Sequence, residues 1–274
     1  MENKRKIFES LLPRGIVARK QLTSRVFHEN FTESKCMTGI WRFFLIIWKR
    51  GGPKIQSSDQ WMNTIEGERS VVKILLQQFS DIKLLQCFVR SVQWIDQSIQ
   101  IDLASLIGRV TAAAATAINV PESSFESFAK VGVRVWRYLA EEKEIEDDGT
   151  PLSCLFSSKW LFEDLYLIML QIGSVITVFE QNESSDYLSS IDTRIQKISP
   201  SSNIRMKSGD ITKTRRNYSE LFMSMVPESE IPMLWSILFA YIPDATVFHW
   251  VYAHLILLEK TGIPKDQRKS SVIV

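Results

Sequence analysis

Positively charged side chains that could bind phosphate groups are concentrated in two stretches of the chain. Residues 1–60 contain twelve Lys and Arg against five Asp and Glu, and residues 193–217 contain seven against one. The formal net charge of the whole chain is only +2. Because the positive charge is so unevenly distributed along a chain that is otherwise 45% hydrophobic, the sequence predicts a polyanionic partner.

The first stretch interleaves cations with aromatic rings, and the second places them in a polar, serine-rich segment. Cations bind phosphates and exposed rings stack on bases, although most rings of Trp41–Trp48 are expected in the core, with the cations at its rim. A solvated surface loop without a ligand is the alternative for the second stretch. From both stretches we expect RNA contacts by Arg42, Lys49, Arg50, Lys54, Arg205, Lys207, Lys213, Arg215 and Arg216.

A third group of arginines interrupts two strongly apolar helical segments. Arg109 lies in one, while Arg134 and Arg137 lie in the other, three residues apart on one helix face. An arginine in such a segment must extend to the surface, form an ion pair or line a groove. These arginines therefore either contact phosphates in a groove between two lobes or pair with the nearby acidic run Glu141–Asp148.

Residue patterns that support catalysis are absent from the sequence. It contains no GxSxG nucleophile elbow, no Walker loop, no GxGxxG motif and no HExxH motif. His249 and His254 are five residues apart, so they splay on a helix and make a poor metal pair. Cys36, Cys87 and Cys154 are far apart and are expected as small core residues. We therefore predict no catalytic residues, no metal site and no cofactor, and a protein that is not an enzyme.

The elements that position these cations are expected to be helices throughout. Eleven Gly and nine Pro are few for 274 residues, and no strong strand-like alternation occurs, so we predict an all-α fold. Leu165–Phe179 is expected as a buried core helix, with Glu163 and Asp164 favouring its dipole. Periodicity and cap signals predict helices over Phe27–Lys49, from about Gln60, and over Ser70–Phe79, Ile82–Ile95, Asp102–Ile118, Ser123–Ala140, Lys159–Phe179, Arg215–Met225 and Ala245–Lys260.

The chain is expected to form a two-lobed helical protein with an N-terminal arm and a C-terminal tail. The acidic run and the following Gly149-Thr150-Pro151 mark the boundary between the lobes. The polar segment 199–214 is expected as a loop. The predicted organisation is therefore an arm over 1–20, an N-terminal lobe over 21–145, a C-terminal lobe over 151–262 and a tail over 263–274.

One helical segment resembles a known family. The stretch IDLASLIGRVTAAAATAI is similar to the Leu-x-Arg-Val/Leu-Ala-Ala helix of phlebovirus and tenuivirus nucleoproteins, which belong to segmented negative-strand RNA viruses. The preceding order, an aromatic helix closing on Lys49-Arg50-Gly51-Gly52, resembles their N-terminal lobe. The similarity covers a short part of the chain, and the second half does not align. Only Arg109 matches by its placement in the helix, and its role stays open.

The resemblance implies a non-enzymatic nucleoprotein that encapsidates single-stranded genomic RNA in a basic groove between the lobes. Phosphates would lie in the groove, and the N-terminal arm and C-terminal tail would join protomers into a homo-oligomer. The viral polymerase would be a further partner, and the protein would occur in the virion and the host cell cytoplasm. The alternatives are a viral matrix-type protein that binds anionic membrane and self-associates, and a cellular helical scaffold. The groove hypothesis requires the two basic stretches to face each other.

Overall fold

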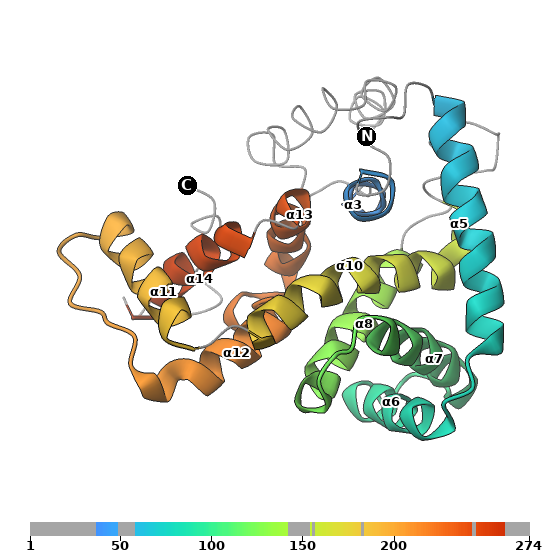
Figure 1. The fold of residues 1–274 in the computed structure, drawn as a ribbon, viewed down its shortest axis with the longest axis horizontal. Coiled ribbons are helices and arrows are strands. Elements are labelled where there is room, and N and C mark those ends of the chain that lie inside the picture. Colours follow the sequence, from blue (N-terminus) through green and yellow to red (C-terminus); the bar gives the residue numbers. More distant parts are fainter. Residues whose placement is uncertain are drawn as a thin grey trace.

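The computed structural model describes residues 37–48, 58–141, 154, 157–181, 184–242 and 245–260. These residues form helices and connecting turns without a β-strand among them, which confirms the predicted all-α fold (Figure 1). A π-helical turn, Phe43–Trp48, continues the first helix. The helices are α3 (Met37–Arg42), α5 (Ser58–Gln78), α6 (Ile82–Ile95), α7 (Ile101–Ala117), α8 (Phe125–Ala140), α10 (Leu161–Gln181), α11 (Ser184–Ile198), α12 (Ile211–Ser219), α13 (Ile231–Tyr241) and α14 (Ala245–Lys260).

Several helix bounds agree with the sequence prediction, two do not, and α11 and α13 were not predicted. α6 and α14 begin and end at the predicted residues, and α7 lies within one residue of its prediction. The two helices expected after Gln60 are a single helix, α5, because Gly67 costs only about 1 kcal/mol in a helix and breaks nothing. α12 begins at Ile211 and ends at Ser219 instead of spanning Arg215–Met225. It ends early because Leu221 and Phe222 have φ angles of 48° and 61°, outside the right-handed helical region.

Small residues on α7 allow neighbouring helices to approach it closely. Ala112–Ala115 are all buried, and α7 contacts α6, α8 and α10. A Cβ atom on Gly108 would lie 2.8 Å from Val89 Cγ2 and 3.0 Å from the Val89 backbone nitrogen, so α6 rests against the α7 backbone. A Cβ atom on Gly132 of α8 would likewise lie 2.8 Å from Thr111 Cγ2. The alanine-rich segment therefore packs as closely as its thin profile predicts.

α10 is the central helix of the molecule. Figure 1 shows it running from the group formed by α6, α7 and α8 towards the group formed by α11, α12 and α14. One hydrophobic cluster contains side chains from both groups and from α10 itself, including Phe128, Ile172 and Phe248. The segment Ser158–Thr177 is long and apolar enough to cross a membrane, yet 72% of it is buried within the protein. α10 therefore connects the two groups through a shared core.

The aromatic helix at the start of the described chain also belongs to this core. Trp41 is fully buried, and its indole Nε1 donates a hydrogen bond to Ser236 Oγ of α13 at 2.8 Å. The ring of Trp41 meets the ring of Phe239 edge-on, with centroids 5.3 Å apart. Phe44 is buried as well. The expectation that most of these rings form core is confirmed for Trp41 and Phe44.

The predicted arm and tail, and the predicted lobe boundary at 145–151, lie outside the described residues. Glu141, the first residue of the acidic run, is exposed at the end of α8, and the rest of the run is also outside them.

Candidate nucleic-acid interface

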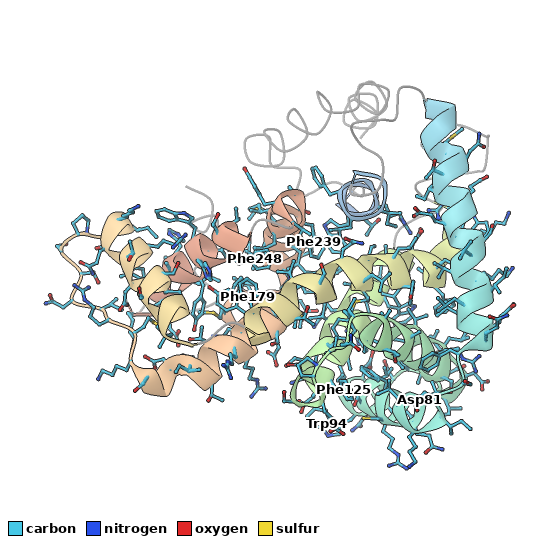
Figure 2. All side chains as sticks on the ribbon, viewed as in Figure 1. Asp81, Trp94, Phe125, Phe179, Phe239 and Phe248 are labelled. Atoms are coloured by element: carbon cyan, nitrogen blue, oxygen red, sulfur yellow. The ribbon has the colours of Figure 1, made fainter. Side chains whose placement is uncertain are left out.

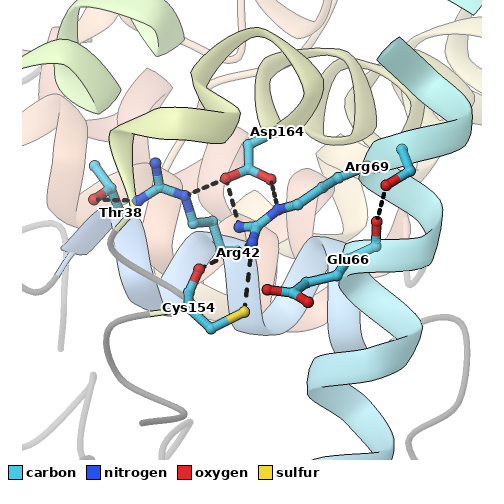
Figure 3. Close-up of polar contacts among 7 residues, drawn as sticks. Thr38, Arg42, Glu66, Arg69, Cys154 and Asp164 are labelled. Atoms are coloured by element: carbon cyan, nitrogen blue, oxygen red, sulfur yellow. Dashed lines mark hydrogen bonds and ion pairs between the residues drawn. The ribbon is translucent and has the colours of Figure 1, made fainter. Parts of the chain in front are cut away.

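Arg42, one of the predicted RNA contacts, lies in the core. Its residue is 1% exposed, and its Nε donates to Asp164 Oδ2 at 2.8 Å (Figure 3). Its Nη1 lies 3.4 Å from Thr38 Oγ1. The prediction that Arg42 binds RNA is therefore wrong, because a guanidinium held in the core by a carboxylate cannot reach a phosphate at the surface.

Asp164 holds a second buried arginine that sequence reasoning did not single out. Arg69 of α5 is fully buried and donates from Nε to Asp164 Oδ1 at 2.7 Å and from Nη2 to Oδ2 at 2.8 Å. Its Nη1 also donates to the Cys154 carbonyl oxygen at 2.9 Å. Asp164 lies in the first turn of α10, as expected, but its main contacts are these two guanidinium groups. The cluster joins α3, α5 and α10 and serves the fold.

The other predicted cations of the first basic stretch cannot be placed in the groove or excluded from it. Lys49, Arg50 and Lys54 lie outside the described residues. That the two basic stretches face each other therefore stays a prediction.

Arg109 is described, and it lies away from the other candidate cations. It is half-buried on α7, and its Nη1 lies 3.4 Å from the carbonyl oxygen of Leu76 near the end of α5. This contact satisfies a carbonyl that the last turn of a helix leaves without a partner. Arg109 thus helps to hold α5 against α7.

Arg134 and Arg137 line a surface hollow between the two halves of the chain. The hollow has a volume of about 460 Å³. One wall consists of α8 and the end of α6, and the other consists of residues between Glu220 and Ile231. Lys130 lies one turn before Arg134 on the same face of α8 and lines the hollow as well, although its sequence position gave no signal.

A second hollow brings Arg215 and Arg216 to the same region. It has a volume of about 370 Å³ and lies between the start of α8 and α12. Its lining includes the hydroxyl-bearing residues Ser123, Ser127 and Thr212. Glu220 lines both hollows, so they adjoin. We call the two hollows together the α8–α12 groove. The groove combines cations from before and after the predicted lobe boundary.

Most of the cations that line the groove form ion pairs with carboxylates. Arg134 pairs with Glu228, and Arg137 pairs with Asp96. The sequence analysis named the acidic run after α8 as the alternative to phosphate contacts, and only Glu141 of that run is described. Glu220 accepts a hydrogen bond from Arg216 Nε at 3.1 Å and from Lys130 Nζ at 3.3 Å.

Lys130 also binds Glu126 at 2.7 Å. Arg215 has no ion-pair partner among the described residues, and it is half-buried in the groove wall. Arg215 is therefore the groove cation that a phosphate can contact without displacing a carboxylate.

The pKa shifts of Asp96 and Lys130 both favour the charged form of the side chain. Hydrogen bonds from the Ser98 hydroxyl and from Arg137 lower the pKa of Asp96, despite its partial burial. Burial disfavours the charged ammonium of Lys130, but the hydrogen bonds and charges of Glu126 and Glu220 outweigh it and raise its pKa. These two groups therefore contribute one negative and one positive charge to the groove near neutral pH.

A strained turn holds the second wall of the groove. Leu221 and Phe222 both have left-handed φ angles, although neither is a glycine. The Phe222 amide donates to the Asn217 carbonyl at 2.8 Å, and Phe222 is fully buried. Such conformations cost about 1–3 kcal/mol each and persist only where packing enforces them, often at functional sites. Here the turn places Glu220 and Met223, on either side of it, in the groove lining.

The remaining cations of the second basic stretch lie outside the groove lining. Arg205 is exposed in the connection between α11 and α12, and its Nη1 lies 3.1 Å from the adjacent Ile204 carbonyl oxygen. Lys207 is exposed in the same connection. Lys213 binds Glu259 of α14 at 2.9 Å. Of the five predicted cations in this stretch, the structure brings together Arg215 and Arg216 with the arginines of α8.

The cysteine and histidine positions agree only in part with the sequence reading. Cys154 is buried, as expected, whereas Cys87 is exposed on α6. The exposure of Cys87 corrects its assignment to the core. His249 is half-buried and shares a 2.7 Å hydrogen bond between its Nδ1 and the Tyr218 hydroxyl, so it lies at a core edge.

No group of three or more His, Cys, Asp and Glu side chains in the described part of the chain could hold a metal ion. Comparison of the chain with protein-family models, with curated proteins and with solved structures finds no match.

Proposed function

We propose that this protein is a nucleoprotein that binds single-stranded RNA along the α8–α12 groove without catalysing a reaction. The observation that carries the proposal is the meeting of cations from distant parts of the sequence in one groove. Arg134 and Arg137 come from α8, and Arg215 and Arg216 come from α12, about eighty residues later. A groove lined in this way follows a phosphate backbone and makes no base-specific contacts by itself.

The charge balance of the groove predicts moderate affinity that depends on ion exchange. Five cations and four carboxylates line it, so it is only slightly positive in the unliganded chain. A phosphate must therefore displace a carboxylate from most of the cations. Glu228 is well suited to displacement because its side chain is 69% exposed. Exposed ion pairs contribute only about 0.2–1 kcal/mol, so their exchange costs little.

Glu220 has the opposite character, since its side chain is 6% exposed and binds two cations. It fixes Lys130 of α8 and Arg216 of α12 relative to each other. We infer that Glu220 shapes the groove, whereas Glu228 yields its arginine to RNA.

Encapsidation belongs to the same proposal. Protomers would assemble along RNA through the N-terminal arm and the C-terminal tail, with the viral polymerase as a further partner, in the virion and the host cytoplasm. The arm at 1–20 and the tail at 263–274 lie outside the described residues, and the composition of the sequence alone supports their role.

Substitutions of the two partners of one ion pair, Arg134 and Glu228, should change RNA affinity in opposite directions, and this tests the RNA groove. Arg134→Gln removes a phosphate contact and should weaken binding of a short fluorescein-labelled pyrimidine RNA by roughly tenfold. Glu228→Gln frees Arg134 from its carboxylate and should tighten binding, up to about fivefold. Fluorescence anisotropy titrations at one fixed salt concentration measure both changes. Glu259→Gln, which breaks the exposed Lys213–Glu259 pair outside the groove, is the matched control and should leave affinity unchanged.

A purely structural ion pair gives a different result. Both substitutions would then lower the melting temperature and change RNA affinity in the same direction or not at all. The purified wild-type protein offers a second check. A ratio of absorbance at 260 to 280 nm typical of protein alone before nuclease treatment, together with no binding of added RNA, would also contradict the proposal.

A further inference from the structure

A large aromatic ring stands exposed at the edge of the α8–α12 groove. Trp94, near the end of α6, is 68% exposed and lines the larger hollow (Figure 2). Figure 2 shows it at the edge of the group formed by α6, α7 and α8. Exposing an indole to water is unfavourable, and nothing in the packing of α6 requires it, since Phe88 and Val92 already bury the inner face of the helix.

Cations flank the Trp94 ring. Lys130 Nζ lies 6.0 Å from the ring centroid. Arg134 and Arg137 continue along α8 from Lys130 and line the same hollow. An aromatic face beside several cations offers partners for both the base and the phosphate of one nucleotide.

The lining of the hollow beside the ring combines apolar and charged side chains. Ile95 and Val133 line it from one wall, and Val226 and Ile231 line it from the other. Its volume of about 460 Å³ lies within the range of about 300–1,000 Å³ typical of sites for small organic groups. An unstacked base would contact the apolar side chains here while its phosphate contacts the cations of the same lining.

We propose that Trp94 is the stacking platform for an unpaired RNA base, with the hollow beside it receiving the ring. The inference rests on the proposed function and adds to it a reason for choosing single strands. A duplex keeps its bases paired and stacked inside, so it presents phosphates to the groove but no base face to Trp94. The groove should therefore prefer single-stranded RNA to duplex RNA at equal charge.

The test compares an RNA that has bases with one that lacks them. Wild-type protein is titrated with a labelled pyrimidine RNA and with an abasic ribose-phosphate chain of the same length. Trp94→Ala should weaken binding of the pyrimidine RNA roughly 5- to 150-fold, the value of one base stack, and leave binding of the abasic chain unchanged. Trp94→Phe should restore most of the affinity because it keeps an aromatic face. Trp250→Ala is the control, since Trp250 is 40% exposed on α14 but does not line the groove.

Three outcomes would overturn the inference. If wild-type protein bound the pyrimidine RNA and the abasic chain equally well, the groove would be a phosphate site only and Trp94 would not stack on a base. Equal loss of both chains in Trp94→Ala would mean that the indole supports the fold and does not stack on a base. Failure of wild-type protein to bind either chain would refute the RNA groove itself, and the stacking inference with it.

Discussion

Arginine residues occupy two different environments in this chain, the core and a surface groove. Arg42 and Arg69 are buried with Asp164, whereas Arg134 and Arg215 line a surface groove. A guanidinium removed from water is tolerated only when a carboxylate and further acceptors satisfy it. Asp164 therefore serves folding, whereas the arginines that line the groove lie at the surface.

Removal of the Asp164 charge should destabilise the protein strongly. Asp164→Asn leaves two buried guanidinium groups without their carboxylate, and breaking such a cluster typically costs about 3–5 kcal/mol. Urea denaturation followed by circular dichroism gives the free energy of unfolding. Glu259→Gln breaks an exposed pair and should cost less than about 1 kcal/mol. Equal losses in the two variants would show that the buried cluster does not stabilise the fold.

His249 should make stability sensitive to pH below neutrality. Burial, reinforced by the charge of Arg194, lowers the pKa of His249 to about 4, whereas a free imidazole has a pKa of about 6.5. The unfolded chain therefore takes up a proton at this residue as the pH falls through about 6.5, while the folded chain does not until about 4. Stability is lost over this interval, by about 2 kcal/mol at pH 5 relative to pH 7.

Urea midpoints at pH 7 and pH 5 measure this loss against His249→Gln, which does not titrate. The variant should show a smaller loss between the two pH values. Parallel pH dependence in wild type and variant would contradict the lowered pKa of His249.

At the scale of elements, close approach of α6, α7 and α8 builds the group of helices that carries one groove wall. Gly108 and Gly132 allow this approach where any side chain would collide with a neighbour. α8 then presents Lys130, Arg134 and Arg137 outward, while Val131 and Val135 face the core. The spacing of Lys130, Arg134 and Arg137 therefore puts the three cations on one face of α8, apart from its packed face.

Two glycine substitutions should change stability in opposite directions. Gly108→Ala forces a Cβ atom to within 3.0 Å of the Val89 backbone nitrogen, which cannot move aside, and should cost about 1–3 kcal/mol. Gly67→Ala adds a methyl group that meets no atom within 4 Å and improves helix propensity, so it should stabilise α5 by up to about 1 kcal/mol. Thermal melts compare the variants, and a stabilised Gly108→Ala would rule out the close contact between α6 and α7.

At the scale of the whole molecule, sequence periodicity predicted the helices well and the long-range partners poorly. The bounds of α6 and α14 followed from apolar spacing and flanking caps. The end of α12 did not, because the left-handed Leu221 and Phe222 carry no glycine signal. Local patterns act over one or two turns, whereas tertiary packing decides such exceptions.

The site was predictable to the same limited degree. Arg134, Arg137, Arg215 and Arg216 were predicted individually as RNA contacts, but the Lys130–Glu220 contact joins residues ninety apart and has no local signature. Trp94 lies two residues after the buried Val92, about 200° around the helix, so the apolar spacing of α6 already places its ring off the core face, although the sequence analysis did not single it out. Arg42 was misassigned because its buried partner, Asp164, lies 122 residues away.

The salt dependence of RNA binding tests the central claim that both sides of the α8–α12 groove hold phosphates. For single strands, the logarithm of the affinity falls with the logarithm of salt concentration by about 0.7 for each phosphate contact. The double variant Arg215→Gln/Arg216→Gln should therefore show a slope shallower than wild type by about 1.4. Lys73→Gln, on α5 away from the groove lining, should keep the wild-type slope. An unchanged slope in the double variant would contradict the RNA groove.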